Sequence, residues 1–257
     1  MRLEDYVVIV TGAGQGMGQG IAQEYAKEGA TVVIAELNVA NGKAVEEAIN
    51  NAGGNAHFIK TDVADEENIE NMVNEVIDRY GKIDTLVNNA GVTLFKPLQD
   101  ITIEDWDTVI NIDLKGTFLC CKYVSKYMMQ KNRGSIINIS SNHSISTLPD
   151  TEVYAAAKAG VNGMSRSMSL SLGKYGIRVN TICPGFTDTP HHQKWLSNHE
   201  DPIEVNEYVL SLHATPRIST PYDIGRLAVY LASDEAEMVT GSDLVIDGGV
   251  TSRLYNS

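Results

Sequence analysis

The stretch "YVVIVTGAGQGMG", residues 6–18, decides the fold. Its first half, 6–11, is a short run rich in valine, which is typical of a strand buried on both faces of a sheet. Glycines follow at positions 12, 14, 16 and 18, and they let the backbone turn tightly and approach a bound group closely. A glycine-rich turn between a strand and a helix N-terminus is suited to binding a pyrophosphate. The stretch therefore predicts a dinucleotide site at the start of an α/β fold.

Short apolar runs alternate with helix-length amphipathic segments along most of the chain. Strands are predicted at 6–11, 31–36, 56–60, 84–88, 135–140, 178–183 and 243–247. Helices are predicted near 18–28, 40–52, 66–80, 102–131, 153–175 and 221–232. This alternation predicts an α/β, Rossmann-like doubly wound parallel sheet of about seven strands with helices on both faces. Because no repeat or linker interrupts the pattern, residues 1–257 are interpreted as a single domain.

The net charge of −13 argues against nucleic acid as a partner, because phosphate binding needs clustered Lys and Arg. It also disfavours an anionic membrane surface, and no apolar run approaches the ~18–20 residues that a membrane span needs. Cys120, Cys121 and Cys183 have no metal-ligand spacing and are interpreted as reduced thiols. The N-terminal segment contains no secretion signal. We therefore expect a soluble, cytoplasmic protein.

One region breaks the alternation. The segment 185–220 is long, is bounded by prolines and holds four of the six histidines together with Trp195 and Tyr208. A long insertion in a compact domain is commonly a lid or binding loop. We predict that 185–220 is a substrate-binding loop or lid, and the alternative is a helical excursion with a structural role only.

The choice of nucleotide depends on Glu36, which ends the second predicted strand twenty residues after Gly16. A carboxylate there can accept hydrogen bonds from the adenosine ribose of NAD, and its charge would repel the 2′-phosphate of NADP. Gln15 in the glycine loop is neutral, and "LNVAN", 37–41, contains no basic residue. The sequence therefore predicts NAD as the cofactor of a single NAD-binding catalytic domain.

Polar residues follow the carboxyl ends of the later strands, where an open α/β sheet binds its ligand. Asp62 could address the adenine, although a simple turn residue is nearly as plausible, and Asn89 could face the adenosine side. Thr187 and Thr189, after the sixth strand, could hold the nicotinamide carboxamide or a phosphate.

The stretch "TEVYAAAKAG", 151–160, places Tyr154 four residues before Lys158 with only alanines between them. Alanine favours a helix, on which positions i and i+4 share one face. A free phenol titrates near ~10 and is a poor base at neutral pH, but a neighbouring ammonium and a bound nicotinium both favour the phenolate. Ser141 ends the fifth predicted strand and could stabilise negative charge on a reacting oxygen.

Taken together, these motifs resemble the short-chain dehydrogenase/reductase family. The resemblance rests on the loop at 11–18, Asn-Asn-Ala-Gly at 88–91, Ser141 followed by Tyr154-x-x-x-Lys158, and Pro-Gly at 184–185, and it covers nearly the whole chain, including "VTGSDLVIDGG" at 239–249. It implies that Tyr154 is the catalytic acid/base, that Ser141 holds the substrate oxygen, and that Lys158 binds the nicotinamide ribose and tunes Tyr154. It further implies a homotetramer or homodimer built on the helices 102–131 and 153–175. The residues predicted to bind the cofactor are Gly12, Gln15, Gly16, Met17, Gly18, Glu36, Asp62, Val63, Asn89, Ala90, Gly91, Tyr154, Lys158, Pro184, Gly185, Thr187 and Thr189.

The sequence departs from the family pattern at one catalytic position. Many relatives carry an asparagine in a segment resembling Asn-Leu-x-Gly, and here "INIDLKGTF", 110–118, places Asp113 there. Asn111 lies roughly 200° away around a helix and cannot simply substitute. An aspartate could accept from the same relay water and would add a negative charge near Lys158. We expect Asp113 to be a working catalytic substitute with a shifted pH profile, and the alternative is a weakened proton relay.

We predict an NAD-dependent oxidoreductase that interconverts a secondary alcohol and a ketone or aldehyde. The histidines favour a small polar substrate such as a sugar or polyol, in contact with Ser141, His143, Tyr154, His191 and Trp195. Adjacent histidines without an acid cluster do not indicate a metal site, so none is predicted. The alternatives are a 3-oxoacyl carrier-protein reductase and a catalytically silent NAD-binding regulator.

Overall fold

The computed structural model describes residues 1–254, which contain one parallel sheet of seven strands. The strands are β1 (Val7–Thr11), β2 (Thr31–Glu36), β3 (Asn55–Lys60), β4 (Thr85–Asn88), β5 (Gly134–Ile139), β6 (Ile177–Pro184) and β7 (Asp243–Ile246). Their order is β3-β2-β1-β4-β5-β6-β7, and every neighbouring pair is parallel. This confirms the predicted doubly wound sheet. The strand order reverses between β1 and β4, and an open α/β sheet binds its ligand at such a point.

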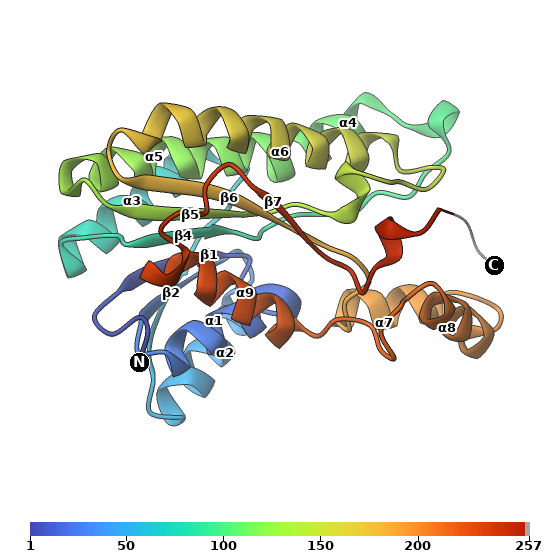
Figure 1. The fold of residues 1–257 in the computed structure, drawn as a ribbon, viewed down its shortest axis with the longest axis horizontal. Coiled ribbons are helices and arrows are strands. Elements are labelled where there is room, and N and C mark those ends of the chain that lie inside the picture. Colours follow the sequence, from blue (N-terminus) through green and yellow to red (C-terminus); the bar gives the residue numbers. More distant parts are fainter. Residues whose placement is uncertain (255–257) are drawn as a thin grey trace.

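Helices cover both faces of this sheet (Figure 1). The α-helices are α1 (Gly16–Lys27), α2 (Val39–Asn51), α3 (Glu66–Tyr80), α4 (Ile103–Val109), α5 (Thr117–Lys131), α6 (Glu152–Gly173), α7 (Pro190–Ser197), α8 (Pro202–Ser211) and α9 (Pro221–Ala232). Short 3-10 turns occur at η1 (Leu98–Asp100), η3 (Asn142–Ser144), η4 (Asp234–Ala236) and η5 (Val250–Ser252). In Figure 1, α1, α2 and α9 lie below the sheet and α3, α5 and α6 lie above it.

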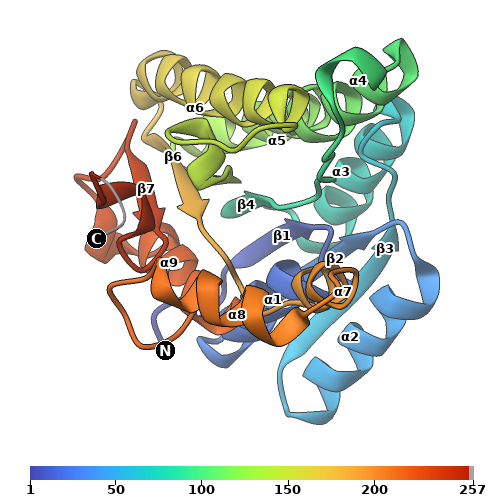
Figure 2. The same cartoon turned by 90° about the vertical axis from the view of Figure 1, so that its right-hand side faces the viewer.

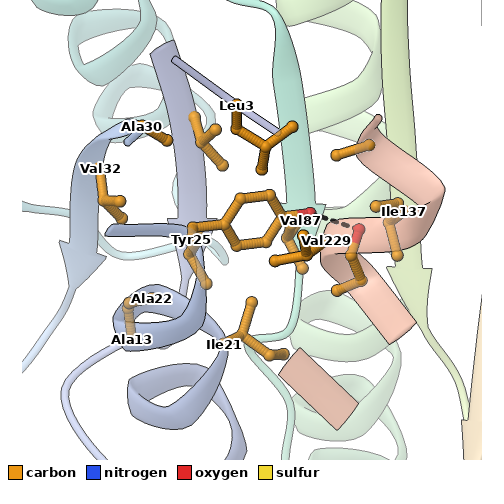
Figure 3. Close-up of a cluster of buried hydrophobic side chains, with 14 of the residues drawn as sticks. Leu3, Ala13, Ile21, Ala22, Tyr25, Ala30, Val32, Val87, Ile137 and Val229 are labelled. Atoms are coloured by element: carbon orange, nitrogen blue, oxygen red, sulfur yellow. Dashed lines mark hydrogen bonds between the residues drawn. The ribbon is translucent and has the colours of Figure 1, made fainter. Parts of the chain in front are cut away.

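Alternate residues of each central strand feed two separate cores, as the period of two in a strand requires. In β1, Val8 and Val10 join the core beneath α1 and α9, while Val7 and Ile9 join the core beneath α3 and α5. Tyr25 of α1 is fully buried in the first core, as Figure 3 shows. Its hydroxyl donates a 2.9 Å hydrogen bond to the main-chain oxygen of Ala228 in α9.

The predicted helix over 102–131 is wrong in one respect, because it is interrupted. A π-helical segment, η2 (Ile110–Gly116), separates α4 from α5. Gly116 at its end packs so closely on Val63 that an added Cβ would lie 2.6 Å from the Val63 main-chain oxygen. A π-helical turn often marks a functional site, and this one contains the buried side chain of Asp113.

The segment 185–220 is also more ordered than a loop, because it contains α7 and α8. Each helix has a proline in its first turn and an N-cap side chain, Thr189 for α7 and Asp201 for α8. Such start signals fix a helix even in a segment without strong amphipathic periodicity. Figure 2 shows both helices side by side, next to α1 and below the strands. Whether the segment acts as a lid stays a prediction.

Candidate active site

Tyr154 and Lys158 lie one turn apart on α6, as their spacing predicts. The Lys158 Nζ atom lies 5.6 Å from the centroid of the Tyr154 ring. Lys158 is buried and donates a 3.2 Å hydrogen bond to the main-chain oxygen of Ile139, at the end of β5. Tyr154 is half-buried and forms part of a cavity wall. The helix therefore presents the phenol to the cavity and the ammonium to the protein beneath it.

The ammonium of Lys158 meets the carboxylate of Asp113. Lys158 Nζ and Asp113 Oδ2 are 2.9 Å apart, and the two side chains are 6% and 0% exposed. The contact is ionic and lacks hydrogen-bond alignment, whereas Asp113 Oδ1 accepts a 2.8 Å bond from the amide of Val92. Burial is the largest single influence and lowers the pKa of Lys158, but Asp113, Tyr154 and Cys183 together outweigh it, with Asp113 contributing most, so the pKa lies above its ordinary value. The lysine is thus held in its charged form.

Gly91, the last residue of Asn-Asn-Ala-Gly, makes room for this pair. A Cβ added there would lie 2.9 Å from Asp113 Oδ2 and 3.3 Å from Lys158 Nζ. Any side chain at position 91 would therefore press on the buried charges. The structure gives this glycine a steric reason beyond its predicted contact with the cofactor.

Ser141 directly follows β5, and its Oγ atom accepts a 3.1 Å hydrogen bond from the amide of His143. The remaining hydroxyl proton makes only a long contact, 3.4 Å, with Asn142 Oδ1. The His143 ring stands edge-on to the Tyr154 ring with centroids 5.5 Å apart. Burial lowers the pKa of His143, so its imidazole is neutral at pH 7. Ser141, His143 and Tyr154 all line the same cavity.

The glycine loop fits a dinucleotide. Gly12 has a φ of +62°, and an added Cβ would lie 2.8 Å from Ala90 Cα. The N-cap residue of α1, Gln15, makes no side-chain capping bond, so the first amides of the helix remain available to an anion. Gly18 sits against the Gly12 main-chain oxygen, where an added Cβ would lie 2.2 Å away. The loop therefore combines a tight turn with free helix amides, the features that pyrophosphate binding needs.

The side chain of Asn89 bonds to the glycine loop. Its Nδ2 atom donates 3.0 Å bonds to the main-chain oxygens of Thr11 and Gly12, and its main-chain amide donates to Thr11 Oγ1. The side chain thus clamps the glycine loop to the end of β4. A direct contact of Asn89 with the adenosine side stays a prediction.

Glu36 ends β2 and is half-buried beside the glycine loop. One carboxylate oxygen accepts a 3.0 Å bond from the amide of Gly14, and the other accepts a 2.9 Å bond from the amide of Asn38. A Cβ on Gly14 would lie 2.7 Å from the Glu36 side chain. The loop therefore fixes the carboxylate at the strand end where a ribose would bind.

The other predicted cofactor residues surround the same crevice. Asp62 is half-buried and accepts a 2.9 Å bond from the amide of Ala64, which is a turn interaction. Thr189 lies 3.5 Å from the position of an added Cβ on Gly16, so the start of α7 approaches the glycine loop. The remaining members are Met17, Val63, Pro184, Gly185 and Thr187; Met17, Gly185 and Thr187 line the cavity, and Val63 and Pro184 are buried.

One cavity of about 530 Å³ connects the Ser141 and Tyr154 side chains with the inner faces of α7 and α8. Of the predicted substrate residues, His143, His191 and Trp195 all line it. Its apolar wall includes Phe95 and Leu148, which were not predicted from the sequence. Phe186, Val205, Tyr208 and Leu212 also line it, and they lie in the predicted binding segment 185–220. The only local signal for Phe95 and Leu148 is that each is a large apolar residue in a segment without secondary structure.

Residues 1–254 contain no group of three or more His, Cys, Asp or Glu side chains that could hold a metal ion. Over the same range, no helix is long and apolar enough to cross a membrane. All three cysteines are free and buried, as expected for reduced thiols.

A doubly wound sheet with a glycine loop at its switch point, and a Ser, Tyr and Lys group beside it, defines a nucleotide-dependent oxidoreductase. Comparison with known proteins supports this class. A family model described as Enoyl-(Acyl carrier protein) reductase matches residues 12–251. The chain belongs to the short-chain dehydrogenase/reductase family.

Relatives and solved structures extend over the whole chain. A 3-oxoacyl-[acyl-carrier-protein] reductase FabG of Thermotoga maritima is 38% identical over 97% of this chain and 99% of its own. A D-threitol dehydrogenase of Mycolicibacterium smegmatis is 37% identical over 98% of this chain and 95% of its own. The crystal structure of levodione reductase superposes with a TM-score of 0.94 at 31% identity, covering 99% of this chain and all of that one.

Proposed function

We propose that the protein is an NAD-dependent oxidoreductase that interconverts a secondary alcohol and a ketone. The observation that carries the proposal is the phenol of Tyr154 in the wall of a cavity, backed by a Lys158 ammonium that is held in its charged form. A phenol so placed can exchange a proton with a substrate oxygen in the cavity, and the ammonium behind it stabilises negative charge on the phenol oxygen.

In this mechanism the nicotinamide, when bound, takes up or supplies the hydride of the substrate carbon. Ser141 donates its hydroxyl proton to the substrate oxygen, because that proton makes only a long contact with Asn142 while the Oγ atom accepts from the His143 amide. Tyr154 takes the hydroxyl proton of the alcohol during oxidation and returns it to the ketone oxygen during reduction. Lys158 stabilises the phenolate between these two events.

The preference for NAD rests on Glu36. Its carboxylate is fixed by the amides of Gly14 and Asn38 and cannot easily turn away from a nucleotide at the strand end. A 2′-phosphate there would meet the negative charge of Glu36, and 37–41 contains no basic residue. The nearest basic residue in the sheet is Lys60 of β3, the register partner of Glu36. Comparable turnover with NADP would defeat this part of the proposal.

The histidines predict a small polar substrate such as a sugar or polyol, and the likeness to D-threitol dehydrogenase supports this prediction. The large apolar side chains that line the cavity favour a less polar molecule, as argued below. The likeness to the carrier-protein reductase favours the alternative of a 3-oxoacyl substrate. A silent NAD-binding regulator is the third possibility, and the close placement of Tyr154 and Lys158 argues against it.

The proposal includes a homotetramer or homodimer in the cytoplasm. Large apolar side chains are exposed along the helices α4, α5 and α6, namely Ile103, Trp106, Phe118 and Leu170. Such exposure is expected of a face that a second copy covers. Size-exclusion chromatography coupled to light scattering would detect the assembly, and a monomer at micromolar concentration would contradict it.

The test of the reaction is a panel of secondary alcohols and sugars with NAD⁺ or NADP⁺, followed by absorbance at 340 nm. Tyr154→Phe, which keeps the ring and removes the acid/base group, should lower kcat by about 10²–10⁴-fold. Retained NADH binding by this variant would show that the site still folds. Activity equal to the parent enzyme would remove Tyr154 from the mechanism.

A further inference from the structure

Within residues 1–254, the substrate cavity is lined without carboxylate, ammonium or guanidinium side chains. Among the residues that the structure places around it there is no Asp, Glu, Lys or Arg. Burial lowers the pKa of two of its imidazoles, His143 and His192, so both are neutral at pH 7. A carboxylate or phosphate on a substrate would enter this cavity without a partner, which is costly in a partly dry site.

The side of the cavity formed by α7 and α8 is aromatic. Trp195 stacks on His192 with ring centroids 5.6 Å apart and packs on Phe186 at 5.8 Å. The His199 ring meets Trp195 edge-on at 4.7 Å, and His199 Nδ1 is already bonded to the Trp195 main-chain oxygen at 3.0 Å. These rings support one another and present flat, largely apolar surface. We call this group of Phe186, His192, Trp195 and His199 the aromatic wall.

Three large side chains of the cavity lining are also partly exposed to solvent. Phe95, Leu148 and Tyr208 are 49%, 52% and 58% exposed. They come from three separate segments, the loop after β4, the loop before α6, and α8. Apolar side chains that converge on one opening while remaining half-exposed have surface to gain from an apolar ligand.

Some of the polar side chains that line the cavity already form hydrogen bonds within the protein. Thr147 Oγ1 lies 2.9 Å from His143 Nδ1 and 2.8 Å from Thr151 Oγ1. A polyol carries a hydroxyl on every carbon, and each buried hydroxyl without a partner costs about 1–3 kcal/mol. A ligand with one reacting oxygen and a hydrocarbon body avoids this cost.

We propose that the substrate is an uncharged secondary alcohol or ketone whose body is an apolar ring, bound between the aromatic wall and the side chains of Phe95 and Leu148. This proposal rests on the proposed oxidoreductase function and names its substrate class. The reacting oxygen meets Ser141 and Tyr154, and the ring fills the cavity beneath α7 and α8.

The first experiment compares kcat/KM for cyclopentanol, cyclohexanol and cycloheptanol with threitol and xylitol at saturating NAD⁺. Each added ring CH₂ should raise kcat/KM about fourfold, which corresponds to about 0.8 kcal/mol. The cyclic alcohols should exceed the polyols at least tenfold. Higher kcat/KM for the polyols, or for the anionic 3-hydroxybutyrate, would overturn the substrate class and leave the oxidoreductase function standing.

A matched pair of variants locates the ring. Leu148→Asp places a carboxylate in the cavity wall and should lower kcat/KM for cyclohexanol at least tenfold. Ile145→Asp adds the same charge to the same loop at a side chain that is equally exposed and does not line the cavity. It should change kcat/KM less than twofold. Equal losses in the two variants would contradict the placement.

Binding can be followed without turnover, because the chain contains only two tryptophans, Trp106 and Trp195. In Trp106→Phe, the fluorescence of Trp195 should change saturably with cyclohexanone in the presence of NAD⁺, a pair that cannot react. A response without turnover of any alcohol would refute the proposed function and retain the ring site. A response to threitol and none to cyclohexanone would refute the ring site.

Discussion

The two ends of the cavity differ in how they are built. At the catalytic end, Lys158 and Asp113 are buried charges held by the sheet and by the π-helical segment η2. At the other end, α7 and α8 present a neutral aromatic surface, and the side chains at its rim are half-exposed. The catalytic end fixes chemistry with a few rigid polar contacts, whereas the α7–α8 end selects by shape and apolar area. Changes at the first should affect kcat, and changes at the second should affect KM.

Lys158→Met should produce the largest effect, because it removes the cation behind Tyr154 and leaves Asp113 buried without its partner. We expect kcat to fall by about 10²–10⁴-fold. The free energy of unfolding should fall by about 3–5 kcal/mol, the usual cost of breaking one side of a buried ion pair. Steady-state kinetics and urea unfolding measure the two losses separately.

The double variant Lys158→Met with Asp113→Leu separates stability from catalysis. Replacing both charges by apolar groups is often neutral for stability. The double variant should therefore recover most of the unfolding free energy and none of the activity. Recovery of activity would show that the ion pair supports the fold alone.

Much of the catalytic end was predictable because its residues form recognisable patterns over short stretches of the sequence. The glycine loop follows a strand, and Tyr154 and Lys158 share a helical face, so short-range spacing suffices. The π-helical segment η2 within 102–131 has no local signal in the sequence, and it ends where Gly116 packs closely on Val63, a contact that exists only in the folded chain. The sequence likewise contains Asp113 but does not specify the 2.9 Å geometry of its contact.

For the α7–α8 end, the sequence indicated an unusual segment, 185–220, but not the helices within it. Four histidines and Trp195 marked 185–220 as unusual, but the two helices came from capping residues, Thr189 and Asp201, that are weak signals alone. Phe95 and Leu148 were missed because they meet this region only after folding. Residues from distant loops that meet in a cavity wall leave no periodic pattern in the sequence from which the wall could be predicted.

Asp113→Asn tests the catalytic end more gently and should shift the pH profile of kcat/KM. Removing the negative charge leaves Lys158 uncompensated, and this favours the phenolate of Tyr154, so the acid limb moves to lower pH. We expect a shift of about one pH unit, or 1.36 kcal/mol. At alkaline pH the activity of this variant should decline earlier than that of the parent enzyme, because Asp113 raises the pKa of Lys158 and burial lowers it once that charge is gone.

Few titratable groups lie near Lys158 and Asp113, so the shift in the pH profile can be assigned to the loss of the Asp113 charge. The titratable groups that face Lys158 are Asp113, Tyr154 and Cys183, and the ring of His143 faces Tyr154. Asp113→Ala serves as the comparison, because it also loses the acceptor of the Val92 amide. If Asp113→Asn keeps the pH profile of the parent enzyme, Asp113 has a structural role only and does not influence Tyr154 through the charge of Lys158.

Asp201→Ala should have the smallest effect and tests whether α8 opens independently of the catalytic end. Asp201 accepts hydrogen bonds from the amides of Ile203 and Glu204 at 3.1 and 3.0 Å and is the N-cap of α8. Loss of an N-cap costs about 1 kcal/mol, so local opening of α8 should increase about fivefold. Hydrogen exchange should quicken in α8 while α6 keeps its protection, and KM should rise about twofold with kcat unchanged. Faster exchange in α6 as well would mean that the two ends unfold together, and the division between a rigid catalytic end and a separable cover would fail.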